Sequence, residues 1–414
     1  MKETTSHTSP VQDQKIHTRN LAITALVAVS LVLILFQFWQ LLTGLYDVDF
    51  NAFETAIKSL LAGDTPYRAH GTEQAFHYPL WTSFLYLPVA FLGHNVARYS
   101  WLTINLVVLA GVVWLLAKVY LPGLKSIYLI PLYCFGLTIS TLNLLDGFPG
   151  IIVVAGFALM LNAIKQEKMV WAGIWGMLGL VIKPQITFVI GAALLLWLFN
   201  PSRSERRRAA RWWLSAVVAG FVLLVVSWIV HPNWIQLLVN ALKNDNLTGG
   251  IGPDGVEYEW VTSTFTSWLN FVANVADPAL TILYIIVALG LVAGMVLRLV
   301  EWRLALLPLL SLAAALNLAV TPYTRPYDYP LLLLPVFFLL SVIRSAYAKG
   351  NRSQVSLCVT GLILVFLVPV YNKDFRWFYL QPFLLIISLL LLKPFELAEN
   401  EQEIKEEAYA QTTK

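Results

Sequence analysis

Four carboxylates lie close together in the segment YDVDFNAFETAIKSLLAGDTPY, residues 46–67: Asp47, Asp49, Glu54 and Asp64. The segment follows a long apolar stretch that begins at residue 21. A carboxylate at the mouth of a membrane cavity is costly unless it is paired or used in function. One such use is as a general base, which takes the proton of a reacting hydroxyl group. Asp47 and Asp49 also have the spacing of two metal ligands, but two oxygen ligands do not make a site, and we expect no metal.

The same segment has a structural interpretation. Its apolar side chains recur at helical spacing, which predicts an amphipathic helix at the membrane interface. The sequence NAFE at 51–54 matches a capping box, in which Glu54 reaches back to the first residue of the helix. Asp49 would then be a helix cap. Because Asn51 can cap the helix by itself, Asp47 and Asp49 remain available for chemistry.

The composition indicates a membrane protein. Hydrophobic residues make up 58% of the 414 residues and charged residues only 13%, whereas soluble domains are near a quarter charged. Cys134 and Cys358 lie far apart in apolar runs and lack metal-site spacing. The chain has no phosphate-binding glycine loop, zinc-protease motif, nucleophile elbow or nucleotide fingerprint. These absences speak against an NTP-driven motor, and no segment could build the basic polar face that a nucleic-acid partner would need.

Apolar runs of about 20 residues predict membrane-spanning helices. We expect about twelve of them, at 21–43, 79–96, 100–120, 148–164, 169–182, 185–199, 211–230, 278–298, 304–320, 328–345, 355–371 and 378–393.

A further apolar stretch, 126–145, contains Pro131, Gly136 and a polar run, and we expect it to be a re-entrant segment that lines a cavity. The predicted fold is thus an all-α polytopic bundle. It comprises a cytoplasmic tail (1–20), a multi-pass catalytic domain (21–393) and a second cytoplasmic tail (394–414).

Basic loops give the expected orientation in the cell membrane, because clustered Lys and Arg stay in the cytoplasm. The strongest signal is RSERRRAAR at 203–211, and KQEK at 165–168 agrees with it. The loops 46–77 and 231–277 then lie outside the cytoplasm. Lys183 and the turn TPYTRPYDYP at 321–330 fall on the same outer side, so the site is expected there.

Three motifs resemble a known family. The pattern D-F-x-x-F-x-x-A, L-x-x-G-D-T-P-Y, F-H-Y-P (49–56, 60–67, 76–79) resembles the first extracytoplasmic loop of the GT-C superfamily. LVIKPQ at 180–185 and TPYTRPYDY at 321–329 are similar to a helix break and a late turn of glycosyltransferase family 87, bacterial polyprenol-phosphomannose-dependent alpha-mannosyltransferases. The chain departs from that family in NLLDG at 143–147, and in having Arg325 and Asp328 where a histidine is common.

The resemblance implies a membrane hexosyltransferase without a cofactor. It would move mannose from a polyprenyl-monophosphate donor to a lipid or glycan hydroxyl, with inversion by single displacement. The resemblance maps the essential aspartate of the family onto Asp49, as general base. Lys183 and Arg325 would bind the leaving phosphate. Further candidate substrate contacts are Asp47, His77, Tyr78, Asp146, Gln185 and Asp328.

Alternatives remain for the cations and for the class of protein. Lys183 could extend to the membrane interface instead, and Arg325 could pair with Asp328 to stabilise the loop. A transporter or flippase of lipid-linked glycans would have similar hydropathy, but it should show matched broken helices in its two halves. A lipid-linked glycan polymerase is the other alternative, and we expect it to carry an Arg-rich outer loop, whereas 231–277 is acidic and aromatic.

Overall fold

A computed structural model describes residues 10–44, 48–67, 76–244, 277–301, 305–321, 324–371 and 380–392. All regular structure in these ranges is helical. The α-helices are α1 (Pro10–Thr43), α2 (Val48–Leu61), α3 (Leu80–Ser83), α4 (His94–Tyr120), α5 (Leu129–Asp146), α6 (Gly150–Lys165), α7 (Met169–Val181), α8 (Phe188–Trp197), α9 (Arg203–Val230), α10 (Trp234–Asn244), α12 (Asp277–Glu301), α13 (Leu306–Val320), α14 (Leu333–Ala348), α15 (Arg352–Tyr371) and α16 (Leu380–Leu390). The 3-10 turns that bear on the site are η1 (Phe84–Tyr86), η3 (Pro184–Ile186) and η5 (Pro326–Leu332).

Several of these helices suit a lipid bilayer. In the described part of the chain, five stretches are long and apolar enough to cross a membrane: Asn20–Thr43, His94–Tyr120, Ser126–Asp146, Arg203–Val230 and Pro326–Ala348. Six shorter apolar helices of 10–17 residues accompany them. These features are those of an all-helical, polytopic membrane protein. The number of twelve crossings stays a prediction.

The segment 79–96 does not form the spanning helix that its composition predicts. Only α3 and η1 form at its start, and α4 begins at His94. Pro88 cannot donate a backbone hydrogen bond, and Gly93 is extended, with φ −63° and ψ 148°. Only some of its apolar side chains are buried within the protein, such as Leu80 and Tyr86, whereas Phe91 and Val96 are exposed.

The segment 126–145 also differs from expectation, because α5 is unbroken. Pro131 lies in the first turn, where a helix needs no donor. At Gly136, a Cβ would lie 3.1 Å from Cγ2 of Val113, so the small residue allows α5 to pack closely on α4. Thr138 donates back to the Cys134 carbonyl at 3.0 Å, which satisfies a polar side chain inside the helix. The re-entrant path is therefore not confirmed.

These two differences cancel in the count of crossings that precede residue 148. Removing one expected crossing at 79–96 and adding one at 126–146 leaves the later segments on the same expected side. The basic segment 203–211 is not a loop, since it forms the first turns of α9.

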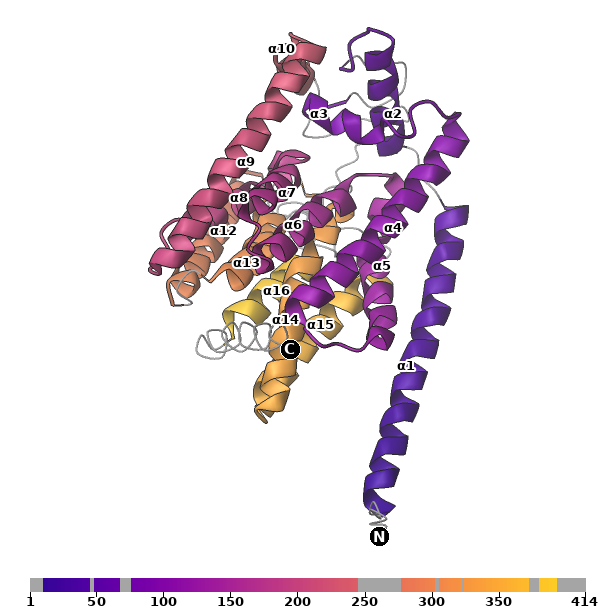
Figure 1. Cartoon of the computed structure of the whole chain (residues 1–414), viewed down its shortest axis with the longest axis vertical. Coiled ribbons are helices and arrows are strands. Elements are labelled where there is room, and N and C mark those ends of the chain that lie inside the picture. Colours follow the sequence, from indigo (N-terminus) through magenta and orange to yellow (C-terminus); the bar gives the residue numbers. More distant parts are fainter. Residues whose placement is uncertain are drawn as a thin grey trace, which may run out of the picture.

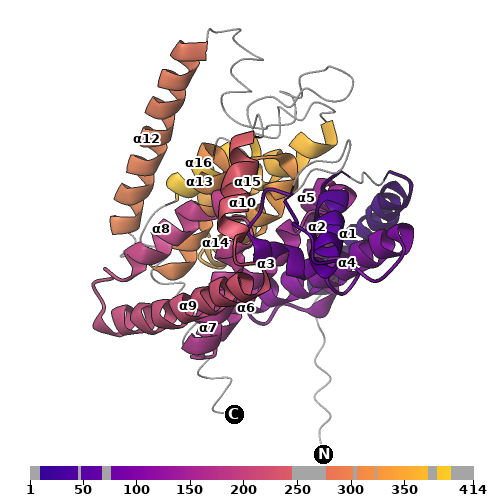
Figure 2. The same ribbon diagram turned by 90° about the horizontal axis from the view of Figure 1, so that it is seen from above.

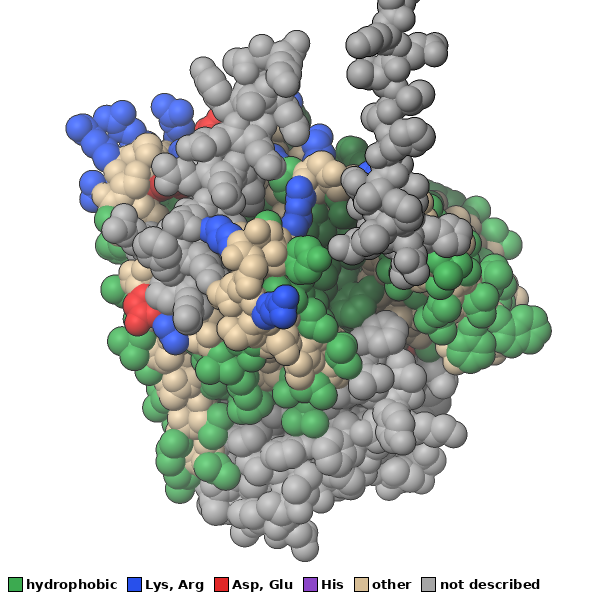
Figure 3. Space-filling view, turned by 90° about the horizontal axis from the view of Figure 1, so that it is seen from below, with side chains coloured by type: hydrophobic (Ala, Val, Ile, Leu, Met, Phe, Trp, Pro, Cys, Tyr) green, Lys and Arg blue, Asp and Glu red, His purple; other side chains and the backbone are tan. Residues whose placement is uncertain are grey.

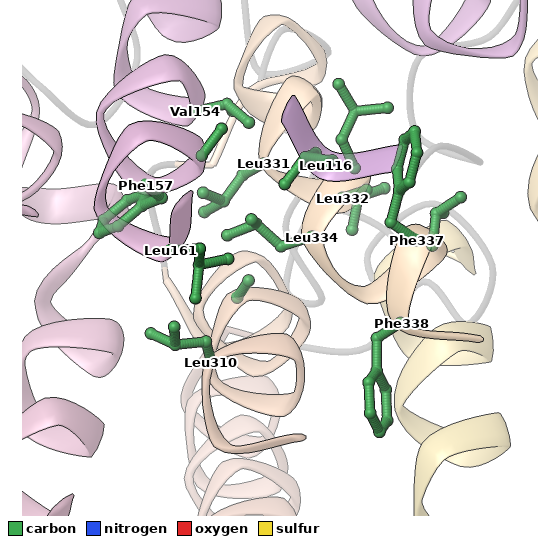
Figure 4. Packing of buried hydrophobic residues seen from close by; sticks show 14 of the residues in the cluster. Leu116, Val154, Phe157, Leu161, Leu310, Leu331, Leu332, Leu334, Phe337 and Phe338 are labelled. Atoms are coloured by element: carbon green, nitrogen blue, oxygen red, sulfur yellow. The ribbon is translucent and has the colours of Figure 1, made fainter. Parts of the chain in front are cut away.

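The packed interior lies between α4, α6, α13, η5 and α14. Figure 4 shows Leu116 of α4, Phe157 of α6, Leu310 of α13 and Phe337 of α14 converging in this layer. Lipid is as apolar as leucine, so close packing rather than escape from water stabilises helix contacts within a bilayer. Gly156 illustrates this, because a Cβ there would lie 2.8 Å from the backbone nitrogen of Gly179 on α7.

The two ends of the bundle differ in character. In Figure 1, α2, α3 and α10 lie together at the upper end, while α1 runs along one side. Figure 2, seen from above, places these short helices over the longer ones. Figure 3 shows the opposite face, where Lys and Arg side chains are more numerous than acidic ones. The candidate residues gather beneath α2 and α3.

Candidate active site

Helix α2 packs against a cluster of aromatic rings. The Phe53 ring stacks on Tyr86, with centroids 4.6 Å apart and planes at 8°, and on Tyr78 at 4.8 Å. The expected capping box is wrong, because α2 begins at Val48 and Asn51 lies inside it. Glu54 instead accepts from Lys58 and lies 2.6 Å from Nδ1 of His94, at the start of α4. This contact joins α2 to α4.

Asp49 is buried beneath α2. It is only 5% exposed, and its Oδ2 has no hydrogen-bond partner among the described residues. Asp49 is the second residue of α2 and does not cap the helix through this atom. Burial raises the pKa of the Asp49 carboxyl, while the charges of Arg325 and Lys183 and a side-chain hydrogen bond from Tyr327 oppose that rise. A buried carboxylate with a free oxygen and a raised pKa is suited to accept a proton.

The break between α7 and α8 presents Lys183 to the same region. α7 ends at Val181, and Pro184 opens η3. The helix end leaves carbonyls without intrahelical donors. Side chains of α3 satisfy two of them: Trp81 donates to the Val181 carbonyl at 2.9 Å, and Thr82 to that of Ile182 at 3.1 Å. The break is therefore stable in a buried setting.

Lys183 is paired with Asp328. The Nζ to Oδ1 distance is 2.7 Å, and the two side chains are 3% and 0% exposed. The other oxygen of Asp328 accepts the backbone N–H of Arg325 at 3.0 Å. Lys183 Nζ also lies 4.3 Å from the centroid of the Phe148 ring and 4.6 Å from that of Tyr327. The carboxylate of Asp328 thus binds Lys183 and not the guanidinium of Arg325.

Arg325 is the cation that remains. It precedes η5, is half-buried, and has its Cζ 5.7 Å from the centroid of the Tyr327 ring. Within the described ranges, no carboxylate oxygen lies within 4.0 Å of its side-chain nitrogens. Its charge acts directly on Asp49. The site therefore combines one free carboxylate oxygen with one unpaired guanidinium.

The C-terminal end of α5 completes the cluster. Asp146 is its last residue, and the charges of Asp49 and Arg325 act on its carboxyl. Gly147 ends the helix with φ +74°, and its carbonyl accepts two buried donors, the Tyr86 hydroxyl and the Trp101 indole, both at 2.7 Å. These bonds fix the place at which Asp146 enters the site.

The comparison with family models decides the class of protein. The model described as glycosyltransferase family 87 matches residues 76–322, which is more than half of the 414-residue chain. The chain belongs to glycosyltransferase family 87. It is a membrane glycosyltransferase, as the sequence motifs predict, and it uses a sugar donor and an acceptor. A comparison with curated proteins finds no match.

The matched range covers only part of the site of this glycosyltransferase. It includes α3, Asp146 and Lys183, but Asp49, Arg325 and Asp328 lie outside it. The functions of these three residues are therefore argued from geometry. Family membership speaks against the alternative of a transporter, because transport requires no sugar transfer.

The other predicted contacts fall in different places. Tyr78 joins the cluster, since its ring packs against Phe53 and Phe148 and Asp49 acts on it electrostatically. His77 precedes it and is half-buried. Gln185 contributes its backbone, whose carbonyl accepts from Thr321 Oγ1 at 3.3 Å. Asp47 lies outside the described residues. Among those that are described, no group of three or more His, Cys, Asp and Glu is placed to hold a metal.

Three residues of this site in the glycosyltransferase are not among those that the sequence motifs predict. Tyr327 faces both cations and acts on Asp49, although it belongs to the RPYDY motif. Arg98 is buried in α4 and donates to the Leu144 carbonyl at 3.2 Å. A lone arginine in an apolar run is itself a signal of function or pairing. Phe148 stacks on Tyr327 at 4.8 Å, and no sequence signal distinguishes it from other core aromatics.

Proposed function

We propose that this protein transfers mannose from a polyprenyl-monophosphate donor to a hydroxyl group of a lipid or glycan acceptor. One observation carries the proposal: Asp49 offers a free, buried carboxylate oxygen, and the unpaired guanidinium of Arg325 acts on it in the same cluster. Such a transfer needs a base for the acceptor and a cation for the leaving phosphate.

In the proposed reaction, Asp49 takes the proton of the acceptor hydroxyl. The acceptor oxygen then bonds to the anomeric carbon, and the bond from that carbon to the phosphate oxygen breaks. The electron pair leaves with the polyprenyl phosphate, whose added negative charge Arg325 stabilises. Asp49 later loses the proton to solvent.

The charges favour a monophosphate donor. A polyprenyl-phospho-sugar is a phosphodiester with one negative charge. Lys183 is already paired with Asp328, so Arg325 supplies one positive charge to match it. A diphosphate-linked or nucleotide-linked sugar carries at least one more negative charge, which would need a further cation.

The assignment of a single carboxylate implies inversion. Retention by double displacement needs a second carboxylate as nucleophile. Asp328 is bonded to Lys183 and to the Arg325 backbone, and we assign Asp146 to binding of sugar hydroxyls. Asp49 then acts as base in a single displacement, and the new glycosidic bond has the opposite anomeric configuration.

We place the reaction on the extracytoplasmic side of the cell membrane. The face rich in Lys and Arg lies at the end of the bundle opposite α2 and α3, and such faces stay in the cytoplasm. The site beneath α2 then lies towards the outer leaflet, where a lipid-linked donor and acceptor could reach it.

A transfer assay tests the proposal. Full-length protein in lipid nanodiscs is incubated with a panel of polyprenyl-phosphate hexoses, each labelled in the sugar, and a membrane lipid extract. We expect label from the mannose donor to appear in a new product of inverted configuration, and Asp49→Asn to abolish it. Equal transfer from a nucleotide sugar without any polyprenyl donor would overturn the proposal.

A further inference from the structure

We propose that Lys183 is a positioning residue, which acts through Asp328 to hold Arg325 towards the donor, and not a ligand of the donor phosphate. The inference rests on the proposed function, because it assumes that Arg325 binds the phosphate. It assigns the second buried cation of the site to a structural task that the residue type alone does not suggest.

The contacts form a continuous chain. Lys183 Nζ contacts Oδ1 of Asp328 at 2.7 Å, and Oδ2 of the same carboxylate accepts the Arg325 N–H at 3.0 Å. One carboxylate therefore joins the break after α7 to the backbone of the residue that carries the free guanidinium. A second bond, from Asn143 to the Tyr327 carbonyl at 2.8 Å, holds the same turn on α5.

The ammonium group of Lys183 is already surrounded by protein groups that it contacts. Besides the carboxylate, it faces the rings of Phe148 at 4.3 Å and Tyr327 at 4.6 Å. An ammonium has three donors and is strongly attracted to aromatic faces when it is desolvated. A phosphate would have to displace Asp328, which would leave a buried, unpaired anion at high cost.

Loss of Lys183 would redirect Asp328 rather than merely remove a charge. Asp328 is three residues from Arg325 and already bonded to its backbone. Once unpaired, its carboxylate could pair with the Arg325 guanidinium, on which its charge already acts. Pairing of these two would withdraw from the donor the guanidinium that has no carboxylate partner among the described residues.

The series of contacts that includes Lys183 also extends to α3. The backbone carbonyls just before Lys183 are bonded to Trp81 and Thr82 of α3, and the Gln185 carbonyl accepts from Thr321. Lys183 is thus fixed from both sides of the break. This rigidity suits a residue that sets the position of another element.

The test is a double-mutant cycle on donor binding. The variants are Lys183→Met, Asp328→Asn and the double variant, in full-length protein in nanodiscs. The probe is polyprenyl-phosphomannose, with its Kd measured by a binding assay without acceptor. Asn at 328 is neutral but keeps an oxygen that can accept the Arg325 N–H.

A positioning residue and a phosphate ligand give opposite results. If Lys183 acts through Asp328, Lys183→Met weakens donor binding about tenfold or more, a loss of about 1.4 kcal/mol per tenfold. The double variant then recovers to within about threefold of the wild type, since Arg325 is released from the stray carboxylate. If Lys183 binds the phosphate, Asp328→Asn frees it and tightens binding, and the double variant stays as weak as Lys183→Met. That result would overturn the inference.

Two controls keep the outcomes separate. If Lys183→Met does not fold, the double variant decides by itself: a Kd near that of the wild type supports the inference, and a tenfold loss contradicts it. Arg325→Gln tests the underlying proposal. Normal donor binding by Arg325→Gln would remove Arg325 as the phosphate ligand, and with it the proposed function of the site, whatever the cycle shows.

Discussion

The guanidinium carbon of Arg98 lies 5.2 Å from the centroid of the Phe50 ring. Phe50 is the residue that follows Asp49 in the sequence. The same guanidinium donates to the carbonyls of Leu144 and Leu145 at the end of α5. Arg98 therefore joins the helix that carries Asp49 to the helix that ends in Asp146. Together with the bonds from Tyr86 and Trp101 to the Gly147 carbonyl, this buried side chain of α4 sets the relative position of the two carboxylates.

Gly147 makes that approach possible, so Gly147→Ala should damage both stability and activity. A Cβ there would lie 2.8 Å from Nη1 of Arg98 and 2.9 Å from Cβ of Phe50, at φ +74°. Overpacking costs about 1–3 kcal/mol, and left-handed backbone adds about 1 kcal/mol or more. We expect a lower Tm in thermal unfolding and at least a tenfold slower transfer.

Gly123 provides a matched control for Gly147. It also has a positive φ, +72°, but a Cβ there meets nothing within 4 Å. Gly123→Ala should show the backbone strain alone, with nearly normal transfer. Equal effects of the two substitutions would show that contact with Arg98 and Phe50 does not set the geometry of the site.

Asp49→Asn should separate chemistry from folding. Asn keeps the size of the side chain but cannot accept a proton, so we expect transfer to slow by about a hundredfold or more with donor binding retained. Glu54→Gln is the control in the same helix, since Glu54 contacts Lys58 and His94 instead. It should lower Tm with little change in kcat. Full activity of Asp49→Asn in the transfer assay would move the search for the base to Asp47, Asp146 or His77.

The stability of the protein should also report on Asp49. Burial raises the pKa of its carboxyl, so the folded state holds the proton more tightly than the unfolded state. This contribution to the free energy of unfolding falls as the pH rises from about 4, the pKa in the unfolded chain, through the raised pKa. Asp49→Asn removes this titration. Its Tm should exceed that of the wild type at pH 7, and the difference should disappear near pH 4; a difference that is constant with pH would contradict the raised pKa.

Tyr327→Phe should move the pH dependence of transfer. The Tyr327 hydrogen bond lowers the pKa of Asp49 against the effect of burial, while Arg325 and Lys183 lower it by charge and Asp328 raises it. A base works only when deprotonated, so activity is lost as the pH falls through this pKa. Without the hydroxyl, the acidic side of the pH–rate profile should move up by about one pH unit.

Tyr86→Phe is the control for Tyr327. The Tyr86 hydroxyl belongs to the same aromatic cluster but donates to the Gly147 carbonyl. Its loss should lower Tm and leave the acidic side of the profile in place. A profile that is unchanged in Tyr327→Phe would show that the hydroxyl does not act on the base.

The proposed orientation is open to chemical labelling. Asp64 and Ser204 are both exposed, whereas the native Cys134 and Cys358 are buried. In intact cells, Asp64→Cys should react with a membrane-impermeant maleimide, and Ser204→Cys should react only after lysis. The reverse pattern would place the site on the cytoplasmic side.

The sequence by itself determined the features that composition and local chemistry control. Long apolar runs predicted an all-helical membrane protein, because a bilayer tolerates only backbone that is bonded within itself. The motifs around Asp49, Lys183 and Arg325 pointed to family 87, and the family match confirms it. Apolar content did not show where the helix is interrupted, however, and so 79–96, which forms only α3 and η1 before α4 begins at His94, was wrongly predicted to be one spanning helix.

Only the tertiary structure decided how the charged residues are shared. Asp328 is three residues from Arg325 in sequence and 145 from Lys183, yet its carboxylate binds the lysine side chain. Such a pairing depends on how η5 packs beside the break after α7, which no local pattern encodes. Burial by surrounding helices likewise sets the proton affinity of Asp49, since desolvation is a property of the whole fold and not of the D-F-x-x-F motif.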